Sequence, residues 1–379
     1  MRRHLYDEPH EEFRAAFHAF LSKHATPNTD KWETQGVVDR DFWLRAGESS
    51  FLGFEAPTDL GGLDIHDFRY NAVIAEELVD CEVAGDGFAL HNDIVAPYLT
   101  EYCNDEQRAR WLPGFTRGET ITAIAMTEPG AGSDLASITA TASYEGDDVV
   151  VTGSKTFITN GPTADLVFVL ARTEERDGRG MTLVAIERGT PGFDQGNPLH
   201  KIGRRAQDTG ELFFDACRVN KRNIVGESGG AFDVVKKNLP RERLSIAVTA
   251  VASGRHALAL ALAHCRERRT FGQTLGRHQS VMHTLAQMHT ELEVTGSHVD
   301  RCIVALNDGE LTAEEAAAAK YWATEVQWNV IDRALQLFGG YGYMEEFPIA
   351  RMWRDARVQR IYGGTTEIMT EIVGRQLMR

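Results

Sequence analysis

Apolar side chains in the first third of the chain recur every three or four residues, which is the spacing of one helix face. Phe13, Phe17 and Phe20 follow this period, and a second amphipathic run surrounds Tyr70 and Leu78. The Asn-Asp-Glu segment at 104–106 is typical of a helix N-terminus. The pattern predicts a helical N-terminal domain over residues 1–119.

From about residue 120 the helical period gives way to short β-branched segments interrupted by Gly, Asn and Asp. Examples are ITAIAM, DDVVVTGSKTFITNG, ADLVFVLART and GMTLVAIERG. Their length and spacing predict a small antiparallel sheet or barrel, which we assign to residues 120–228. Asn160 and Gly161 close one of these segments, and this pair favours a hairpin turn.

The helical period returns in residues 229–379, now with long runs rich in Ala and Leu. Leu244, Ala247, Val248 and Val251 fall on one helix face, and residues 312–338 predict a second long helix. Both helices are more apolar than surface helices, which indicates a bundle core or a subunit interface. The expected fold is mainly α with a central β domain, flanked by an N-terminal helical domain and a C-terminal helical bundle.

Composition narrows the class of protein. The 379 residues carry a formal net charge of −15, which argues against nucleic acid or an anionic membrane as the main partner. Five scattered cysteines without a Cys-x-x-Cys pair indicate a reducing compartment and no zinc site. The first residues lack the apolar segment of a signal peptide, and no apolar run of membrane-spanning length occurs. We therefore expect a cytoplasmic enzyme without a membrane span.

Two glycine-containing segments of the β region carry candidate ligand-binding chemistry. In MTEPGAGSD, residues 126–134, the glycines allow backbone N–H groups to approach a ligand, and Thr127 and Ser133 add hydroxyls. In GSKTFITNG, residues 153–161, Phe157 and Thr159 are two residues apart and point to one sheet face. Such a pair suits a flat heteroaromatic ring, although a polar turn and a hairpin explain the same residues.

Two further segments belong to the helical C-terminal region. RERRTFG ends a helix at residues 266–272, where Arg268 would pair with a pyrophosphate or simply interact with the helix dipole. A glycine-rich stretch follows Gln336, and residues 361–368 read IYGGTTEI. The alternative explanation for both glycine runs is that glycine ends a helix there.

Taken together and in this order, the motifs resemble those of the acyl-CoA dehydrogenase family along essentially the whole chain. TEPGAGSD and GSKTFITNG are similar to its two flavin signatures, and RRTFG, LFGGYGY and RDARVQRIYGGTTEI to its C-terminal signatures. The resemblance implies a C-terminal four-helix bundle, a homotetramer that shares FAD between subunits, and electron-transferring flavoprotein as electron acceptor. It also implies a role in fatty acid β-oxidation.

The resemblance assigns cofactor residues by matching position. One set would line the isoalloxazine ring of its own subunit, and a second set would hold the FAD diphosphate and adenosine of a neighbouring subunit. A third segment lies near the cofactor, and two residues lie near the CoA thioester. The residues that would line the isoalloxazine ring are Met126, Thr127, Ser133, Phe157 and Thr159, and those that would hold the diphosphate and adenosine are Arg268, Phe271, His278, Gln336 and Gly340. The segment near the cofactor contains Thr365 and Glu367, and the residues near the CoA thioester are Ser133 and Arg243.

The chain departs from the family pattern at the catalytic base. Many members place this base in a Tyr-Glu-Gly-Thr segment, but here Gly363 stands in that position. The long-chain and isovaleryl-type branch instead carries the base on a bundle helix, where this chain has Glu242. The resemblance thus implies Glu242 as the base, with hydride transfer to flavin N5 and the Gly363 N–H at the thioester oxygen. Glu345 and Glu346 are weaker alternatives.

The neighbours of Glu242 suggest how its charge is controlled. Pro240 suits a first helical turn, so we expect Glu242 near a helix N-terminus. The helix dipole and the flanking Arg241 and Arg243 would favour the ionised carboxylate, whereas burial beside a thioester would oppose it. An ordinary first-turn Glu that complements the dipole is the alternative.

The substrate is less constrained than the reaction. The expected substrate is a medium-to-long or branched saturated acyl-CoA, and Gly85, Gly87 and Ala89 are small enough to leave room for its chain. An acyl-CoA oxidase and a dehydrogenase of carrier-protein-bound acyl groups remain alternatives with the same cofactor. A non-catalytic interaction protein with a flavin fold is a more remote alternative, for which Gly363 is the only evidence.

Overall fold

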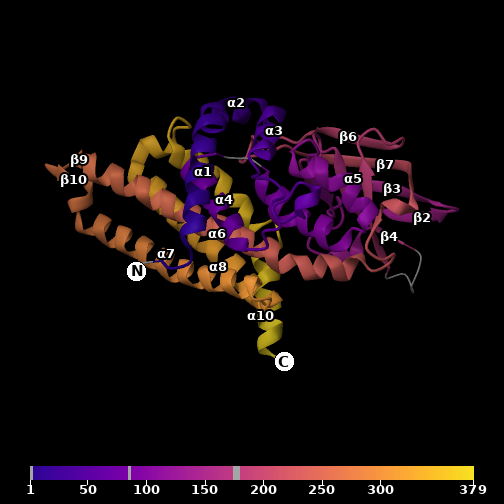
Figure 1. Cartoon of the computed structure of the whole chain (residues 1–379). Helices are drawn as coiled ribbons and strands as arrows, with labels where there is room; N and C mark the ends of the chain where they lie inside the picture. Colours follow the sequence, from indigo (N-terminus) through magenta and orange to yellow (C-terminus); the bar gives the residue numbers. More distant parts are fainter. Residues whose placement is uncertain (1–2, 84–86, 174–179) are drawn as a thin grey trace.

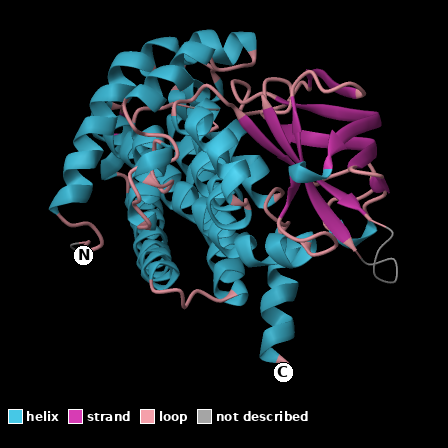
Figure 2. Cartoon of the chain, turned by 45° about the vertical axis from the view of Figure 1, so that its right-hand side comes forward, coloured by secondary structure: helices cyan, strands magenta, loops and turns pink. Residues whose placement is uncertain are grey.

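The computed structural model describes residues 3–83, 87–173 and 180–379. Helices occupy one side of the molecule and the strands gather at the other (Figures 1 and 2). This arrangement confirms the predicted fold class of helical N- and C-terminal domains around a central β domain. Gly85, which the sequence suggested as a substrate-facing residue, lies outside the described residues.

The N-terminal domain is helical, as the apolar period predicted. Its core is rich in aromatic rings: Phe17 packs edge-on against Phe51, and Trp43 stacks on Phe88. Asn104 caps α5 by accepting a hydrogen bond from the Gln107 N–H, which confirms the predicted helix start. The elements are α1 (Glu8–His24), α2 (Thr29–Gln35), α3 (Arg40–Glu48), α4 (Phe68–Asp80), the π-helical segments η3 (Ala89–Val95) and η4 (Tyr98–Tyr102), and α5 (Asp105–Thr116).

The β domain contains an eight-stranded sheet with the order β6-β7-β3-β2-β4-β5-β8, in which β1 also pairs with β4. Most pairs are antiparallel as predicted, but β1 and β4 run parallel. The long connection between β1 and β4, which includes the β2–β3 hairpin, makes this parallel pairing possible. The strands are β1 (Thr122–Ala125), β2 (Thr141–Glu145), β3 (Asp148–Thr159), β4 (Leu166–Arg172), β5 (Met181–Glu187), β6 (Phe193–Pro198), β7 (Thr209–Asn220) and β8 (Ile224–Val225).

The hairpin turn that the sequence placed at Asn160 and Gly161 is wrong. The tight hairpin joins β2 to β3 instead, where Glu145 pairs with Asp148 across a turn that contains Gly146 at φ +60°. Asn160 ends β3 in a different way, because its amide nitrogen donates to the Thr122 carbonyl at 3.1 Å. The pair therefore ties β3 to β1 rather than to the next strand in sequence.

The C-terminal helices form the predicted bundle around α6. This helix packs along α7 and α8, while α10 packs against α8 and projects from the body of the molecule (Figure 1). Gly254 lets α6 and α7 approach closely, since a Cβ there would lie 2.6 Å from Leu292 Cδ2. The elements are α6 (Ala231–Glu267), β9 (Arg269–Thr270), β10 (Gln273–Thr274), α7 (Gln279–Asn307), α8 (Ala313–Phe338), α9 (Pro348–Ala356) and α10 (Thr366–Leu377).

One helix within the described ranges, α6, is long and apolar enough to cross a membrane by length and composition alone. More than half of its most apolar window, 56%, is buried inside the protein. Burial among neighbouring helices is the expected environment for the central helix of a bundle.

Candidate active site

Two segments that the sequence selected, the 126–134 loop and the end of strand β3, lie side by side in the β domain. The Thr156 N–H donates to the Thr127 carbonyl at 2.9 Å, and Lys155 Nζ donates to the Met126 carbonyl at 3.0 Å. These bonds place the 126–134 loop against the end of β3. We call the predicted ring-contacting residues here the strand group: Met126, Thr127, Ser133, Phe157 and Thr159.

A buried ion pair holds the 126–134 loop against strand β3. Lys155 Nζ lies 2.8 Å from Glu128 Oε1, and both side chains are almost fully buried. Glu128 also accepts hydrogen bonds from the Ala140 N–H at 2.9 Å and from the Thr139 hydroxyl at 2.8 Å. Burial alone would raise the pKa of Glu128, but the hydrogen bond from Lys155 and those from Thr139 and Ala140 hold it below its usual range.

Two phenylalanines of the predicted cofactor site stand exposed in an unusual backbone conformation. Phe157 is 68% exposed at φ +59°, and Phe271 is 98% exposed at φ +49°. Left-handed backbone is uncommon for a bulky residue and marks sites where strain serves a function. Gly130 and Gly132 leave open space where a side chain would stand. The exposed ring of Phe157 beside this open, hydroxyl-bearing loop fits a large cofactor with a flat ring, so the residues here match FAD.

A second set of predicted cofactor residues gathers at the far end of α6. We call Arg268, Phe271, His278, Gln336 and Gly340 the hairpin group, because Phe271 stands between β9 and β10. His278 braces this hairpin through the Thr270 hydroxyl at 3.1 Å and the Gln273 amide at 3.2 Å. Arg268, Gln336 and Gly340 line one hollow of about 500 Å³ beside the hairpin. Arg268 thus lies at the same surface as Gln336 and Gly340, which follow it by about 70 positions in the sequence.

The strand group and the hairpin group lie at opposite ends of the molecule (Figure 1). Between them runs α6, whose 37 residues span about 55 Å at the rise of an α-helix. One chain therefore does not bring the two groups to the same cofactor.

Glu242 lies in the middle of α6 and not near a helix N-terminus, so that part of the sequence prediction is wrong. The helix begins at Ala231, and Pro240 lies inside it without ending it. Glu242 is buried at 7% exposure, and its Oε1 lies 3.5 Å from the Tyr98 hydroxyl. Burial raises the pKa of Glu242 to about 7, opposed by Arg243 and Tyr98. The carboxyl is therefore poised to exchange a proton near neutral pH.

The two arginines that flank Glu242 differ in role. Arg241 turns away and pairs with Glu55, so it does not act on Glu242 as the sequence suggested. Arg243 is buried, and its Nε has no hydrogen-bond partner among the described residues. Burial lowers the pKa of Arg243, with the charge of Glu242 opposing. A buried guanidinium with a spare donor suits an oxygen of a bound ligand.

Gly363 packs against the face of α6 that carries Glu242. A Cβ at Gly363 would lie 2.4 Å from Ile246 Cδ1, and Ile246 is one helical turn from Glu242. Gly363 also has φ +64°, a conformation that disfavours any side chain. Lys320 secures this turn, because its buried Nζ donates to the Gly364 carbonyl at 2.6 Å. A carboxylate side chain at Gly363 would therefore meet both steric contact and backbone strain.

The remaining predicted residues near this turn have simpler environments. Thr365 is the N-cap of α10, and its hydroxyl accepts the Ile368 N–H at 3.3 Å. Glu367 is exposed in the first turn of that helix. Glu345, a weaker candidate for the base, pairs on the surface with Arg354 at 3.1 Å and Arg205 at 3.2 Å.

Sequence reasoning missed the partners that hold these residues in place. Tyr98, Lys155 and Ile246 belong to segments far from the residues that they support. Lys155 had the clearest signal, because a lone cation in a half-buried strand requires a buried acid. Tyr98 had none, since its position follows from the π-helical turns of η3 and η4.

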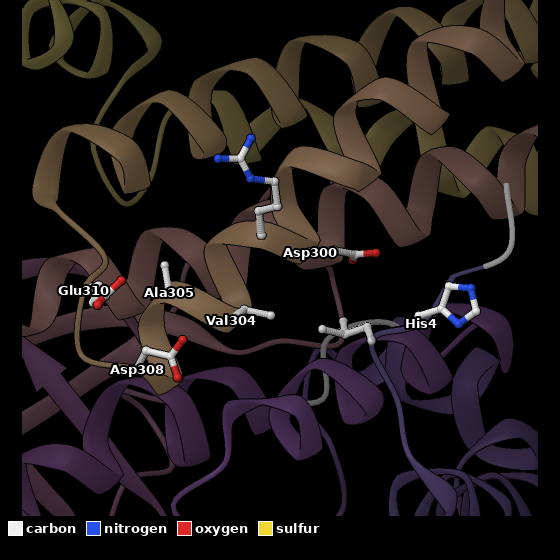
Figure 3. Close-up of a pocket in the computed structure, with 8 residues that line it drawn as sticks. His4, Asp300, Val304, Ala305, Asp308 and Glu310 are labelled. Carbon is white, nitrogen blue, oxygen red and sulfur yellow. The ribbon is translucent and has the colours of Figure 1, made fainter.

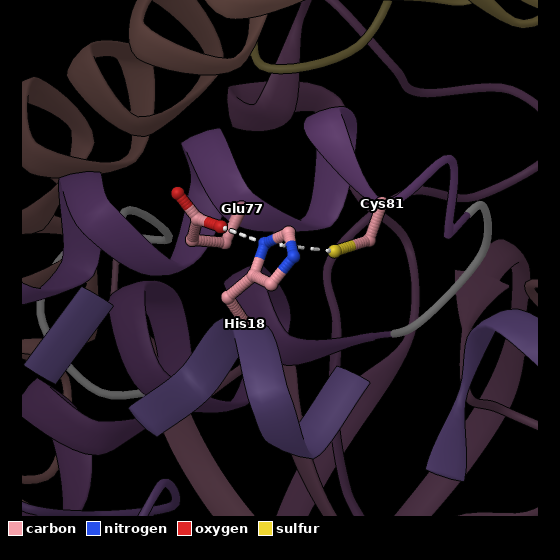
Figure 4. A group of neighbouring side chains, drawn as sticks. All are labelled: His18, Glu77 and Cys81. Carbon is pink, nitrogen blue, oxygen red and sulfur yellow. Dashed lines mark hydrogen bonds and ion pairs between the residues drawn. The ribbon is translucent and has the colours of Figure 1, made fainter. Parts of the chain in front are cut away.

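Two other features with chemical side chains lie away from these groups. One is an open hollow of about 430 Å³, which His4 and Asp300 help to line (Figure 3). The other joins His18 of α1 to Glu77 and Cys81 at the end of α4 (Figure 4). His18 Nδ1 lies 2.8 Å from Glu77 Oε2, and the other Glu77 oxygen accepts from Arg14 at 2.9 Å. Burial raises the pKa of the Cys81 thiol to about 11, so this group is a hydrogen-bonded cluster.

Comparisons with known proteins cover nearly the whole chain. Three family models match: the acyl-CoA dehydrogenase N-terminal domain at residues 7–119, the middle domain at 123–217 and the C-terminal domain at 229–378. A mitochondrial long-chain specific acyl-CoA dehydrogenase of Sus scrofa is 41% identical over 99% of this chain and 88% of its own length.

Solved structures agree with the sequence matches. An acyl-CoA dehydrogenase from Geobacillus kaustophilus has a TM-score of 0.96 at 44% identity and covers 98% of each chain. An acyl-CoA dehydrogenase from Bacillus anthracis, solved as a complex with FAD, has a TM-score of 0.90 at 27% identity. It covers 99% of this chain and 67% of its own.

Proposed function

Because this chain belongs to the acyl-CoA dehydrogenase family, we propose that Glu242 is the base that removes the α proton of its substrate. The protein is an oxidoreductase that uses FAD to dehydrogenate acyl-CoA thioesters. The observation that carries the proposal is a buried carboxyl whose pKa is raised by burial to about 7. Gly363, the alternative position for a base, packs against the helix face that holds this carboxyl.

The surroundings of Glu242 suit proton abstraction at neutral pH. A general base works best when its pKa lies near the working pH. Tyr98 orients the carboxyl from one side at 3.5 Å, and Arg243 supplies positive charge from the next residue along α6. The backbone N–H of Gly363 is our candidate donor to the thioester oxygen, where it would favour loss of the α proton.

FAD would be held by the strand group at its ring and by the hairpin group at its diphosphate and adenosine. When bound, FAD supplies the acceptor for the β hydrogen, which leaves as hydride with two electrons. Phe157 and the Thr159 hydroxyl would contact the ring, while Arg268 would pair with the diphosphate. The residues of this chain position the cofactor and supply the base.

The separation of the two groups supports sharing of FAD between subunits. Each hairpin group would then serve the strand group of a neighbouring chain, and we infer a homotetramer. Electron-transferring flavoprotein is our proposed electron acceptor. The five cysteines, which are buried and free throughout the described residues, support a reducing compartment, and we retain the cytoplasm as the proposed location.

The substrate we propose is a medium-to-long or branched saturated acyl-CoA, which becomes the trans-2-enoyl-CoA. The first test is anaerobic mixing of the purified protein with a panel of acyl-CoAs while the absorbance of oxidised flavin is followed. Bleaching by saturated thioesters supports the proposal, and the chain that bleaches most efficiently defines the substrate class.

Other results of the same test would assign a different function. Rapid reoxidation by air would indicate an oxidase, and bleaching by carrier-protein thioesters alone would indicate a carrier-dependent enzyme. A colourless protein that takes up no added FAD would indicate a non-catalytic member of the family.

The rate of flavin reduction should rise with pH and level off, with a midpoint near pH 7 in the free enzyme. The reason is that only the deprotonated form of Glu242 accepts a proton, and burial raises its pKa to about 7. Stopped-flow absorbance at subsaturating acyl-CoA measures this profile. A flat profile between pH 5 and 8, the interval over which this change is expected, would contradict the role of Glu242.

A further inference from the structure

A narrow cavity runs beside α6 on the face that carries Glu242. Two hollows of about 70 and 80 Å³ share Leu78, Val79, Val83, Arg204 and Thr249 in their linings, so they adjoin one another. We call this space the α4–α6 cavity. Its walls come from α4, α6, α8 and α9 and from the loops beside them.

The cavity begins within one helical turn of Glu242. Asp93 lines it and bonds to the Ser245 hydroxyl, and Thr249 and Ser253 line it farther along the same helix face. From Glu242, Thr249 lies about 10 Å and Ser253 about 16 Å along the helix axis. Since an extended acyl chain advances at most ~1.5 Å per carbon, it needs at least about 7 and 11 carbons to reach these levels. The residues that line the cavity therefore extend to the depth that a long acyl chain would reach.

The cavity has an apolar wall that suits a hydrocarbon chain, but its lining also contains buried polar atoms that a hydrocarbon does not satisfy. Ile74, Ala75 and Leu78 of α4 provide an apolar wall. Three buried amide oxygens among the lining residues have no hydrogen-bond partner within the described parts of the chain: Asn71 Oδ1, Gln327 Oε1 and Gln359 Oε1. Each of these residues is at most 2% exposed. A buried acceptor without a donor is costly, and a plain hydrocarbon offers no donor.

The charged groups of the same region already have partners. His256 lies 3.2 Å from Glu82 and 3.5 Å from Asp80, and Arg351 lies 3.5 Å from Glu82. Asn71 donates to Asp93 at 2.7 Å through its nitrogen, which leaves its oxygen free. What the cavity needs is thus a neutral hydrogen-bond donor and not an anion.

We propose that the preferred acyl group is long and carries a hydroxyl group far from the thioester, which donates to the unpaired amide oxygens of Gln327 and Gln359 in the far part of the α4–α6 cavity. This inference rests on the proposed function. Gln327 lies beside Gly254 of α6, which places its amide at the level reached by the end of a long chain. Gln327 and Gln359 are therefore the specificity-determining residues for a terminal hydroxyl.

The test compares palmitoyl-CoA with ω-hydroxypalmitoyl-CoA as reductants of the flavin in the anaerobic holoenzyme. We expect the hydroxylated thioester to be more efficient by about tenfold, the effect of one added hydrogen bond to a group otherwise unpaired. In the double variant Gln327→Met/Gln359→Met this preference should disappear, while reduction by palmitoyl-CoA is retained. Flavin content and thermal midpoint show whether the variant is folded.

Thr295→Val is the matched control, because the Thr295 hydroxyl is also buried and has no partner among the residues that the structure describes, but it does not line the cavity. Its preference should equal that of the wild type. Equal efficiency of the two thioesters in the wild type, or a preference that survives in the double variant, would overturn the inference. If no acyl-CoA reduces the flavin, the proposed function itself fails, and this inference fails with it.

Discussion

Replacement of Glu242 by Gln is expected to slow flavin reduction by acyl-CoA on the order of 10³-fold while FAD stays bound. Gln has nearly the same shape as Glu but accepts no proton, and Glu242 is a buried carboxyl one helical turn along α6 from Ile246, the residue that contacts Gly363. Anaerobic stopped-flow absorbance of oxidised flavin measures the loss.

A matched variant on the same helix is Asp233→Asn, since the Asp233 side chain is 90% exposed near the start of α6. It should reduce flavin at the wild-type rate. If Glu242→Gln retained normal reduction, another group would have to be the base, and Glu345→Gln would then be the next variant to examine.

The same replacement should change stability in a pH-dependent way. The pKa of Glu242 in the folded protein is about 7, above its ordinary value of 4.5. Its contribution to stability is therefore fully present below pH 4.5 and is lost as pH rises through 7, by about 3 kcal/mol in total. The measured quantity is the thermal midpoint of Glu242→Gln minus that of the wild type. This difference should be larger at pH 8 than at pH 4.5. A variant that is inactive but more stable at pH 8 is the expected signature of a buried carboxylate that serves as a catalytic base.

Glu128→Ala is expected to lower the free energy of unfolding by about 3–5 kcal/mol and to weaken FAD binding. The change leaves the Lys155 ammonium buried without its partner, and it removes the acceptor for Thr139 and Ala140. Because this carboxylate holds the 126–134 loop against β3, the strand group should lose its arrangement. Denaturant unfolding and flavin fluorescence measure the two effects.

The double variant Glu128→Ala/Lys155→Met tests the physical cause. Met fills a volume similar to that of Lys without a charge, so the double variant should be more stable than Glu128→Ala alone. Were the two equally unstable, the hydrogen bonds to Thr139 and Ala140 would be the main contribution and not the buried charge.

The apolar period predicted the helical regions and the order of the domains, because burial of one face repeats in sequence wherever a helix packs on a core. It did not predict the start of α6. Pro240 was interpreted as a first-turn residue, although proline also occurs inside long helices when neighbouring helices support the surrounding turns. Local sequence carries no information on that tertiary support.

In the β domain, turn chemistry predicted that strands end but not which strands pair. Asn160 and Gly161 end β3, yet Asn160 bonds to Thr122 of β1. The tight hairpin instead uses Gly146 between β2 and β3. Partner choice depends on side chains that become neighbours only in the folded sheet.

Motifs located the candidate site residues, but their supports were found only in the structure. Glu242 could be selected because Gly363 removes the alternative base, a comparison that needs only sequence. Tyr98 and Ile246 could not be selected from the sequence. Their distances to Glu242 and Gly363 depend on how η4 and the Gly363 turn, which precedes α10, pack on α6. Sequence thus selected candidate reacting groups, whereas it gave no indication of these two residues that hold them in place.

Because the strand group and the hairpin group lie far apart, retention of FAD should depend on the concentration of the protein. If every FAD bridges two chains, holoprotein exists only as an assembly, and dilution below the subunit dissociation constant releases flavin. The thermal midpoint of the yellow protein would then rise with protein concentration, as it does when folding is linked to association. A chain that enclosed its whole cofactor would show a midpoint independent of dilution. If FAD is shared in this way, a single subunit would bind no FAD by itself and would therefore have no redox activity.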